Sequence, residues 1–104
     1  MRNRAKAVFR IASGPLVNAT GREAQTIIAL VEAGTKGITS LETFKAGWAV
    51  RLGAYIFDLK AMGVPIHATR EPHDGGNHAR YFVGDQVELV EAFDPANPKR
   101  KVDA

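Results

Sequence analysis

Cysteine is absent from the 104-residue sequence. Disulfide bonds and thiolate metal sites are therefore excluded, and packing alone must stabilise the fold. No apolar run approaches the roughly 18 residues that a membrane-spanning helix needs. The first residues also lack the long apolar stretch of a secretory signal. We therefore expect a cytoplasmic protein with no membrane partner.

Motifs for catalysis and cofactor binding are missing as well. The sequence has no serine or cysteine nucleophile with a paired base, and no glycine fingerprint for binding phosphate. His67, His73, Asp74 and His78 are potential zinc ligands, but they lack the H-x-x-x-H spacing of a helical site. We interpret the histidines as surface-loop residues. The expected protein is not an enzyme and has neither a cofactor nor a metal site.

The net charge of +3 is concentrated at the two ends of the chain. Arg2, Arg4, Lys6 and Arg10 come before any acidic residue, and residues 99–101 read Lys-Arg-Lys. Basic tails attract the phosphates of nucleic acids by counterion release, which is independent of base sequence. Such tails can equally serve solubility alone, so charge suggests a nucleic-acid partner without establishing one.

A chain of this length has room for one domain. We predict a basic N-terminal arm over residues 1–19, a folded domain over 20–93 and a disordered basic tail over 94–104. Gly14-Pro15 interrupts regular structure within the arm. The apolar residues around Phe9 leave open a short strand or docking of the arm on the body.

Two capping boxes mark the beginnings of the first two helices. Thr20-Gly-Arg-Glu23 opens the first helix, in which Thr20 caps the backbone and Glu23 reaches back. Apolar residues at helical spacing follow as far as Gly34. Thr39-Ser-Leu-Glu42 opens a second, short helix, and we expect Leu41 and Phe44 to face inward.

A third helix and a β-hairpin follow. The helix is predicted from about Trp48 to Met62, with one inward face formed by Leu52, Ile56 and Leu59. Trp48 is expected to fill the core at its start. The hairpin consists of strands over residues 66–71 and 79–83, joined by a turn-rich loop. Residues 86–93 favour a short helix, with a strand as the alternative.

This order of elements is typical of an α+β winged helix-turn-helix fold. The predicted architecture is a three-helix bundle with a C-terminal β-hairpin wing. In this arrangement the third helix enters the major groove of double-stranded DNA, and the neighbouring elements hold the phosphate backbone. The order is more specific than any single motif, because several independent patterns agree.

Four segments carry a more particular pattern: Gly37-Ile-Thr-Ser-Leu-Glu42, Arg51-Leu-Gly-Ala-Tyr-Ile-Phe-Asp-Leu-Lys60, Gly63-Val-Pro-Ile66 and His78-Ala-Arg-Tyr81. They resemble a family of small helix-turn-helix proteins that are common in prophages and bacterial genomes. The resemblance covers about residues 22–83 and departs at Tyr55, where the family pattern has a basic residue. It implies a DNA-binding fold. We expect a small phage or bacterial regulator of transcription.

Arg51 is the leading candidate for contacting a base or a phosphate. The alternative for Arg51 is an ion pair with Glu42 or Asp58. Tyr55 is positioned either to donate to a phosphate or to fill the edge of the core. The full set of predicted DNA-binding residues is Arg51, Tyr55, Lys45, Arg70, Arg80, Arg2, Arg4 and Lys6.

The outward face of the third helix is unusually apolar for a base-reading helix. It is predicted to consist of Val50, Ala54, Phe57 and Ala61, whereas base readers are usually Arg, Lys, Asn or Gln. Exposed apolar patches mark partner surfaces. The alternative function is therefore a protein-interaction or dimerisation module that uses this face to bind a protein partner or a second copy.

Overall fold

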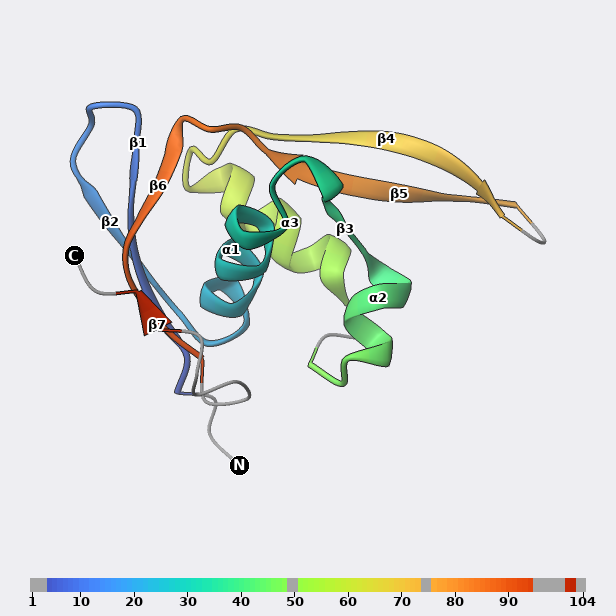
Figure 1. Ribbon diagram of the computed structural model, residues 1–104, viewed down its shortest axis with the longest axis horizontal. Coiled ribbons are helices and arrows are strands. Elements are labelled where there is room, and N and C mark those ends of the chain that lie inside the picture. Colours follow the sequence, from blue (N-terminus) through green and yellow to red (C-terminus); the bar gives the residue numbers. More distant parts are fainter. Residues whose placement is uncertain (1–3, 49–50, 74–75, 95–100, 103–104) are drawn as a thin grey trace.

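The computed structural model describes residues 4–48, 51–73, 76–94 and 101–102. Two sheets lie on either side of the helices (Figure 1). Arg2, Val50 and Asp74, which the sequence analysis singled out, fall outside the described residues. The elements in chain order are β1 Lys6–Ile11, β2 Leu16–Thr20, α1 Gly21–Ala33, the 3₁₀ turn η1 Gly34–Lys36, β3 Ile38–Thr39, α2 Ser40–Lys45, α3 Leu52–Ala61, β4 Ile66–His73, β5 Gly76–Val83, β6 Val87–Phe93 and β7 Lys101–Val102.

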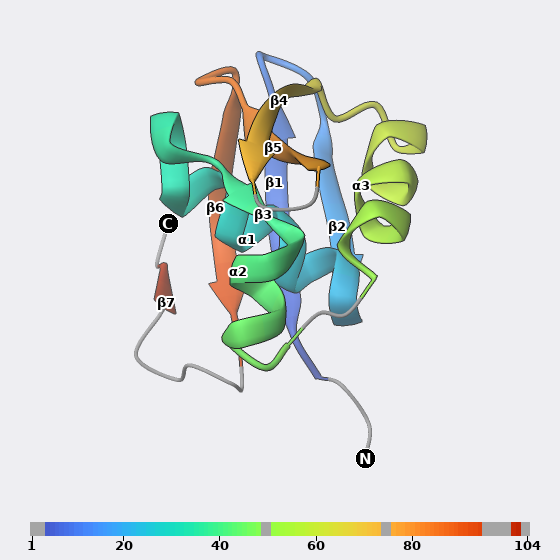
Figure 2. The same ribbon diagram turned by 90° about the vertical axis from the view of Figure 1, so that its right-hand side faces the viewer.

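The larger sheet has four strands in the order β2-β1-β6-β7, and its pairings are antiparallel (Figure 2). Ala5, Ala7 and Phe9 alternate toward the helices, and Phe9 is fully buried. Most of the segment that the sequence analysis assigned to a basic arm is thus a β-hairpin within the folded body. The apolar alternation around Phe9 explains this, because it supplies one wall of the core.

Strand β6 corrects the short helix that was favoured for residues 86–93. Leu89 pairs with Phe9 and Glu91 pairs with Val8, so Val90 is an extra residue at a bulge. The bulge changes the spacing of the inward residues, since the step from Leu89 to the buried Ala92 is three residues rather than two. A three-residue step resembles helical periodicity, which is why the sequence pattern favoured a helix for this segment.

Helix α1 forms the centre of the core, with Ala24, Ile27, Ile28 and Leu30 all fully buried. It begins after Thr20, as predicted, and the backbone of Thr20 is extended there. The side chain of Thr20 makes no capping hydrogen bond, however, so the predicted first capping box is wrong.

The second capping box is confirmed at the start of α2. The backbone amide of Glu42 donates to Thr39 Oγ1 at 3.2 Å, and the amide of Thr39 donates to Glu42 Oε1 at 3.0 Å. The predicted orientation of α2 is wrong, because Leu41 and Phe44 are 55% and 59% exposed. The inward residue is Thr43, whose hydroxyl donates to the carbonyl of Ser40.

Helix α3 begins at Leu52, later than predicted, and packs against α1. Its predicted inward face is confirmed, since Leu52, Ile56 and Leu59 are all buried. Trp48 is half-buried against the same core.

The predicted hairpin is confirmed and projects from the body as a wing (Figure 1). Its strands are longer than predicted, because β4 continues to His73 and β5 begins at Gly76, within the segment predicted as a loop. With β3 the hairpin forms a three-stranded sheet in the order β3-β5-β4. The wing is not the C-terminal element of the fold, because β6 and β7 follow it and complete the other sheet.

Within the predicted tail over residues 94–104, the structure describes Asp94 and strand β7. Asp94 is buried and accepts a hydrogen bond from Gln25 at 3.0 Å, and β7 pairs with β6. Within the described ranges, no helix combines the length and the apolar character that crossing a membrane requires.

Candidate nucleic-acid interface

The exposed side of α3 begins with a basic residue and continues with apolar ones. Arg51 is the N-cap residue of α3 and is exposed. Neither predicted ion pair of Arg51, with Glu42 or with Asp58, is formed among the described residues. Six residues further along, Phe57 is 72% exposed. Among the described residues, the surface of α3 thus offers an unpaired guanidinium at its start and an uncovered aromatic ring in its second half.

Strand alternation gives the wing two faces, and one of them adjoins α3. The hydroxyl of Tyr81 lies 4.0 Å from the position that a Cβ on Gly53 would occupy, so Tyr81 points toward the beginning of α3. Tyr81 pairs with Ala68, and Arg70 pairs with Ala79. These four residues share one face, because paired residues and every second residue along a strand point the same way. Arg70, which is exposed, therefore belongs to the α3 side of the wing.

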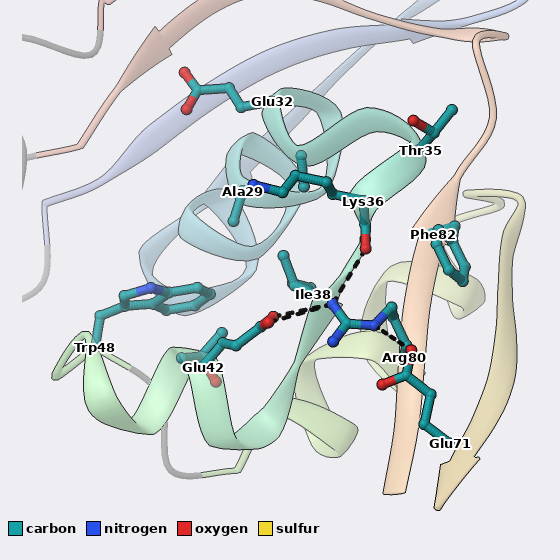
Figure 3. A pocket seen from close by; sticks show the side chains of 13 residues that line it. Ala29, Glu32, Thr35, Lys36, Ile38, Glu42, Trp48, Glu71, Arg80 and Phe82 are labelled. Carbon is teal, nitrogen blue, oxygen red and sulfur yellow. Dashed lines mark hydrogen bonds and ion pairs between the residues drawn. The ribbon is translucent and has the colours of Figure 1, made fainter.

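Arg80 lies on the opposite face of the wing and is engaged within the protein (Figure 3). Its Nε donates to Glu71 Oε2 at 2.6 Å, and its Nη1 lies 3.3 Å from both carboxylate oxygens of Glu42. The same Nη1 donates to the carbonyl of Lys36 at 3.1 Å. Arg80 thus joins the wing to α2 and to η1, in contrast to the free guanidinium expected for a DNA contact.

The charges in this network perturb one another. The hydrogen bond from Arg80 is the main cause that lowers the pKa of Glu71, and the neighbouring His78 adds to it. The same hydrogen bond, which Arg80 donates to Glu71, raises the pKa of Arg80 above its ordinary value. His78 Nε2 lies 2.9 Å from Glu71 Oε1, which extends the chain of contacts along the wing. Both ends of the Glu71 carboxylate are therefore occupied.

The network borders an open groove of about 860 Å³ between the end of α1, α2 and the wing. Trp48 and Phe82 stand at its two sides in Figure 3. Sequence reasoning missed the roles of Glu42 and Glu71. The sequence did contain a signal for these contacts. The dipeptide Asp-Gly at positions 74–75 is typical of a two-residue hairpin turn and so predicts the register of the hairpin. That register places Thr69 opposite Arg80 and Glu71 opposite His78, which brings Glu71 next to Arg80 on one face.

The remaining predicted DNA-binding residues are dispersed. Lys45 is exposed at the end of α2, and Tyr55 is half-buried on α3. Arg4 is exposed just before β1. Lys6 is paired with Glu91, with 3.6 Å between Nζ and Oε1. The structure brings Arg51 and Arg70 to the same side of the molecule but does not gather Lys6 or Arg80 with them.

The alternative apolar surface is smaller than predicted. Phe57 and Ala61 are exposed, as expected, whereas Ala54 is half-buried. Phe57 is therefore its one large exposed side chain among the described residues of α3.

Two carboxylates from different helices meet beside α3. Burial is the main cause that raises the pKa of Glu23 on α1, and a hydrogen bond and charge repulsion from Asp58 on α3 raise it further. This contact replaces the predicted role of Glu23 in a capping box. It also accounts for Asp58, which the sequence analysis offered as a partner for Arg51.

His67 and His78 lie on the strands of the wing, in contrast to the predicted surface loop. The ring of His67 stacks on Phe82, with 5.4 Å between centroids. In the part of the chain that the structure describes, no group of three His, Cys, Asp or Glu side chains is arranged to hold a metal ion.

A family model described as a winged helix domain matches residues 16–92. The chain therefore belongs to the winged helix domain family, and the α+β content of the structure agrees with it. No curated protein and no solved structure gives a significant match.

Proposed function

We propose that this winged helix protein binds double-stranded DNA and acts as a small phage or bacterial transcriptional regulator in the cytoplasm. The observation that carries the proposal is the placement of Arg70 on the α3 side of the wing, where it accompanies the free Arg51. In the proposed complex α3 enters the major groove, as the three-helix arrangement with a wing would allow. Arg51 contacts a base edge or a phosphate, and Arg70 contacts the backbone.

Backbone contacts dominate the proposed complex. Beyond Arg51, the exposed side of α3 offers Phe57, Lys60 and Ala61, which provide few of the groups that read base edges. Lys45, Tyr55 and Arg4 are proposed to add phosphate contacts. Lys6 is left out of the proposed interface, because it is paired with Glu91 on the larger sheet. Arg2 is included on charge alone.

Arg80 is excluded from the proposed interface. Its two carboxylate partners and the Lys36 carbonyl occupy the guanidinium, and it faces away from α3. Its proposed role is to hold the wing against α2, so that Arg70 keeps a fixed position relative to α3.

Fluorescence anisotropy with a labelled DNA duplex tests this proposal over a series of salt concentrations. Arg51→Ala and Arg70→Ala should each weaken binding and reduce the slope of log affinity against log salt by about 1, if each residue neutralises one phosphate. The matched control is Arg10→Ala, since Arg10 lies in the larger sheet, on the strand face opposite Phe9. Absence of binding at low salt, or an equal effect of Arg10→Ala, would refute the proposed interface.

A second candidate function rests on Phe57. An aromatic side chain that is 72% exposed on a helix is suited to a protein partner as well as to thymine methyl groups. Phe57→Glu distinguishes the two, because it removes a protein contact and also adds a charge that opposes DNA. If the variant keeps the DNA affinity of the wild type, Phe57 is outside the DNA interface and the protein-interaction role is favoured.

A further inference from the structure

The four-stranded sheet ends at β2 without a further strand. At the opposite edge β7 pairs with β6, whereas β2 pairs only with β1 among the described residues. Figure 2 shows β2 at this margin of the sheet, beside α3. The outer side of β2 is therefore a place where another strand can be added.

The hydrogen-bond pattern shows which backbone groups face outward. The amide of Gly21 donates to the carbonyl of Ala5 at 2.9 Å, and these residues continue the register that pairs Lys6 with Thr20. In an antiparallel ladder, hydrogen-bonded and non-bonded pairs alternate. Ala19 and Val17 therefore bond to β1, whereas Leu16, Asn18 and Thr20 direct their amides away from it.

These outward groups have no backbone partner among the described residues. Leu16 and Asn18 each present an N–H and a C=O to the edge, and Thr20 presents its N–H. The set is complementary to itself, because a second β2 running antiparallel would offer acceptors opposite these donors.

The side chains of β2 do not protect this edge. Natural edge strands are usually guarded by charges, proline or bulges. Strand β4, an edge of the other sheet, follows that rule with Arg70, Glu71 and Pro72. In contrast, β2 reads Leu-Val-Asn-Ala-Thr, with no charge and no proline, and Leu16 is 49% exposed.

Space for an added strand is available on the α3 side. An open groove of about 380 Å³ lies there, bordered by Asn18 and Thr20 of β2, by Ala61 of α3 and by Met62 just after it. Met62 is 37% exposed at its rim. Glu23 and Asp58 also line the groove, so both apolar and acidic side chains flank the unpaired backbone.

We propose that β2 pairs with β2 of a second copy of this chain, antiparallel and centred on Asn18, to form one sheet across a two-fold dimer. The pair places Asn18 opposite its symmetry mate and Leu16 opposite Thr20 of the partner subunit. It makes about four N–H···O bonds and leaves every bond between β1 and β2 intact. Because β2 is uncharged, the two copies meet without like-charge repulsion across the strand pair.

Sedimentation velocity of the full chain over a range of concentrations tests the dimer. Asn18→Lys places like charges opposite each other on the two-fold axis and should raise the dimer dissociation constant about tenfold. Asn18→Asp should do the same. An equimolar mixture of the two variants should recover the dimer, because opposite charges then face each other. This rescue excludes misfolding as the cause of the loss.

Two control variants locate the interface. Asn18→Thr keeps an uncharged strand former and should preserve the dimer. Phe57→Glu should also preserve it, because Phe57 does not line the groove beside β2. The proposal is overturned if the wild-type chain is monomeric throughout, if Asn18→Lys dimerises as well as the wild type, or if the mixture fails to recover. Loss of the dimer in Phe57→Glu alone would assign dimerisation to α3 instead. DNA binding by a monomer would leave the proposed function standing.

Discussion

Gly37→Ala is expected to destabilise the protein more than any other single methyl addition at a described glycine. Gly37 precedes β3 and has φ +68° with ψ −178°, a backbone region that is almost confined to glycine. A Cβ there would lie 2.6 Å from the carbonyl oxygen of Tyr81 and 2.7 Å from the ring of Phe82. The oxygen belongs to the backbone of the wing, so it cannot turn aside.

Two costs add up at this position. The backbone conformation costs about 1–3 kcal/mol for a residue other than glycine. Overpacking against β5 adds about 1–3 kcal/mol. Gly34→Ala isolates the first cost, because Gly34 also has positive φ, at +55°, but has no atom within 4 Å of its Cβ position. Gly37→Ala should therefore be about 2 kcal/mol less stable than Gly34→Ala, and its Tm should be lower by about 10 °C.

Thermal unfolding followed by circular dichroism measures this difference directly. Both variants should unfold below the wild type, with Gly37→Ala clearly the lower of the two. Equal melting temperatures for the two variants would refute the close contact between Gly37 and the wing.

Three further predictions concern the core, the wing and α3. Phe9→Ala should lower the free energy of unfolding by about 3–5 kcal/mol in denaturant titrations, because the ring is fully buried; a change below 1 kcal/mol, as expected of a loose arm, would contradict its place in the core. The stabilising pair of Glu71 with Arg80 should be present above the ordinary pKa of glutamate, about 4.3, and should be lost as pH falls through the lowered pKa of Glu71. The Tm difference between the wild type and Glu71→Gln should therefore be constant near neutral pH and shrink in acid, and a difference that grows in acid would be inconsistent with the lowered pKa. Gly53→Ala should stabilise α3 by about 0.5–1 kcal/mol, measured as a higher denaturation midpoint, because its Cβ would meet no atom closer than the Tyr81 hydroxyl at 4.0 Å; destabilisation would indicate a tighter contact with the wing.

The parts of the fold that the sequence predicted well depend on unbroken local patterns. Leu52, Ile56 and Leu59 repeat at helical spacing, and all three are buried. The hairpin was predicted from two strand-like segments that flank a turn, and β4 and β5 pair in one register without interruption. In both cases residues close together in the sequence determine the element, so a local pattern is sufficient.

The failures occur where tertiary contacts override the local pattern. Leu41 and Phe44 do share one face of α2, but the capping box and the buried Thr39 turn the Thr43 face inward. The bulge at Val90 gives strand β6 a spacing of apolar residues that resembles a helix. Neither effect is visible without the partner element.

The candidate site shows the same limit. Arg70 and Arg80 looked equivalent in the sequence, since both are basic residues on the predicted hairpin. Only the pairing of Arg70 with Ala79, and of Arg80 with Thr69, separates them onto opposite faces. Charge composition therefore suggested a nucleic-acid partner without separating the two arginines, whereas strand parity decides which of them faces α3.

The central position of β1 has a consequence for how the chain folds during synthesis. Strand β1 pairs with β2, its neighbour in sequence, and with β6, which is made near the end of the chain. Until β6 has left the ribosome, one side of β1 therefore has no strand to pair with. Such long-range pairings slow folding and expose intermediates to aggregation. A two-stranded β1–β2 hairpin is marginally stable by itself, so shortening the chain before β6 should leave α1 and Phe9 without the remaining wall of their core.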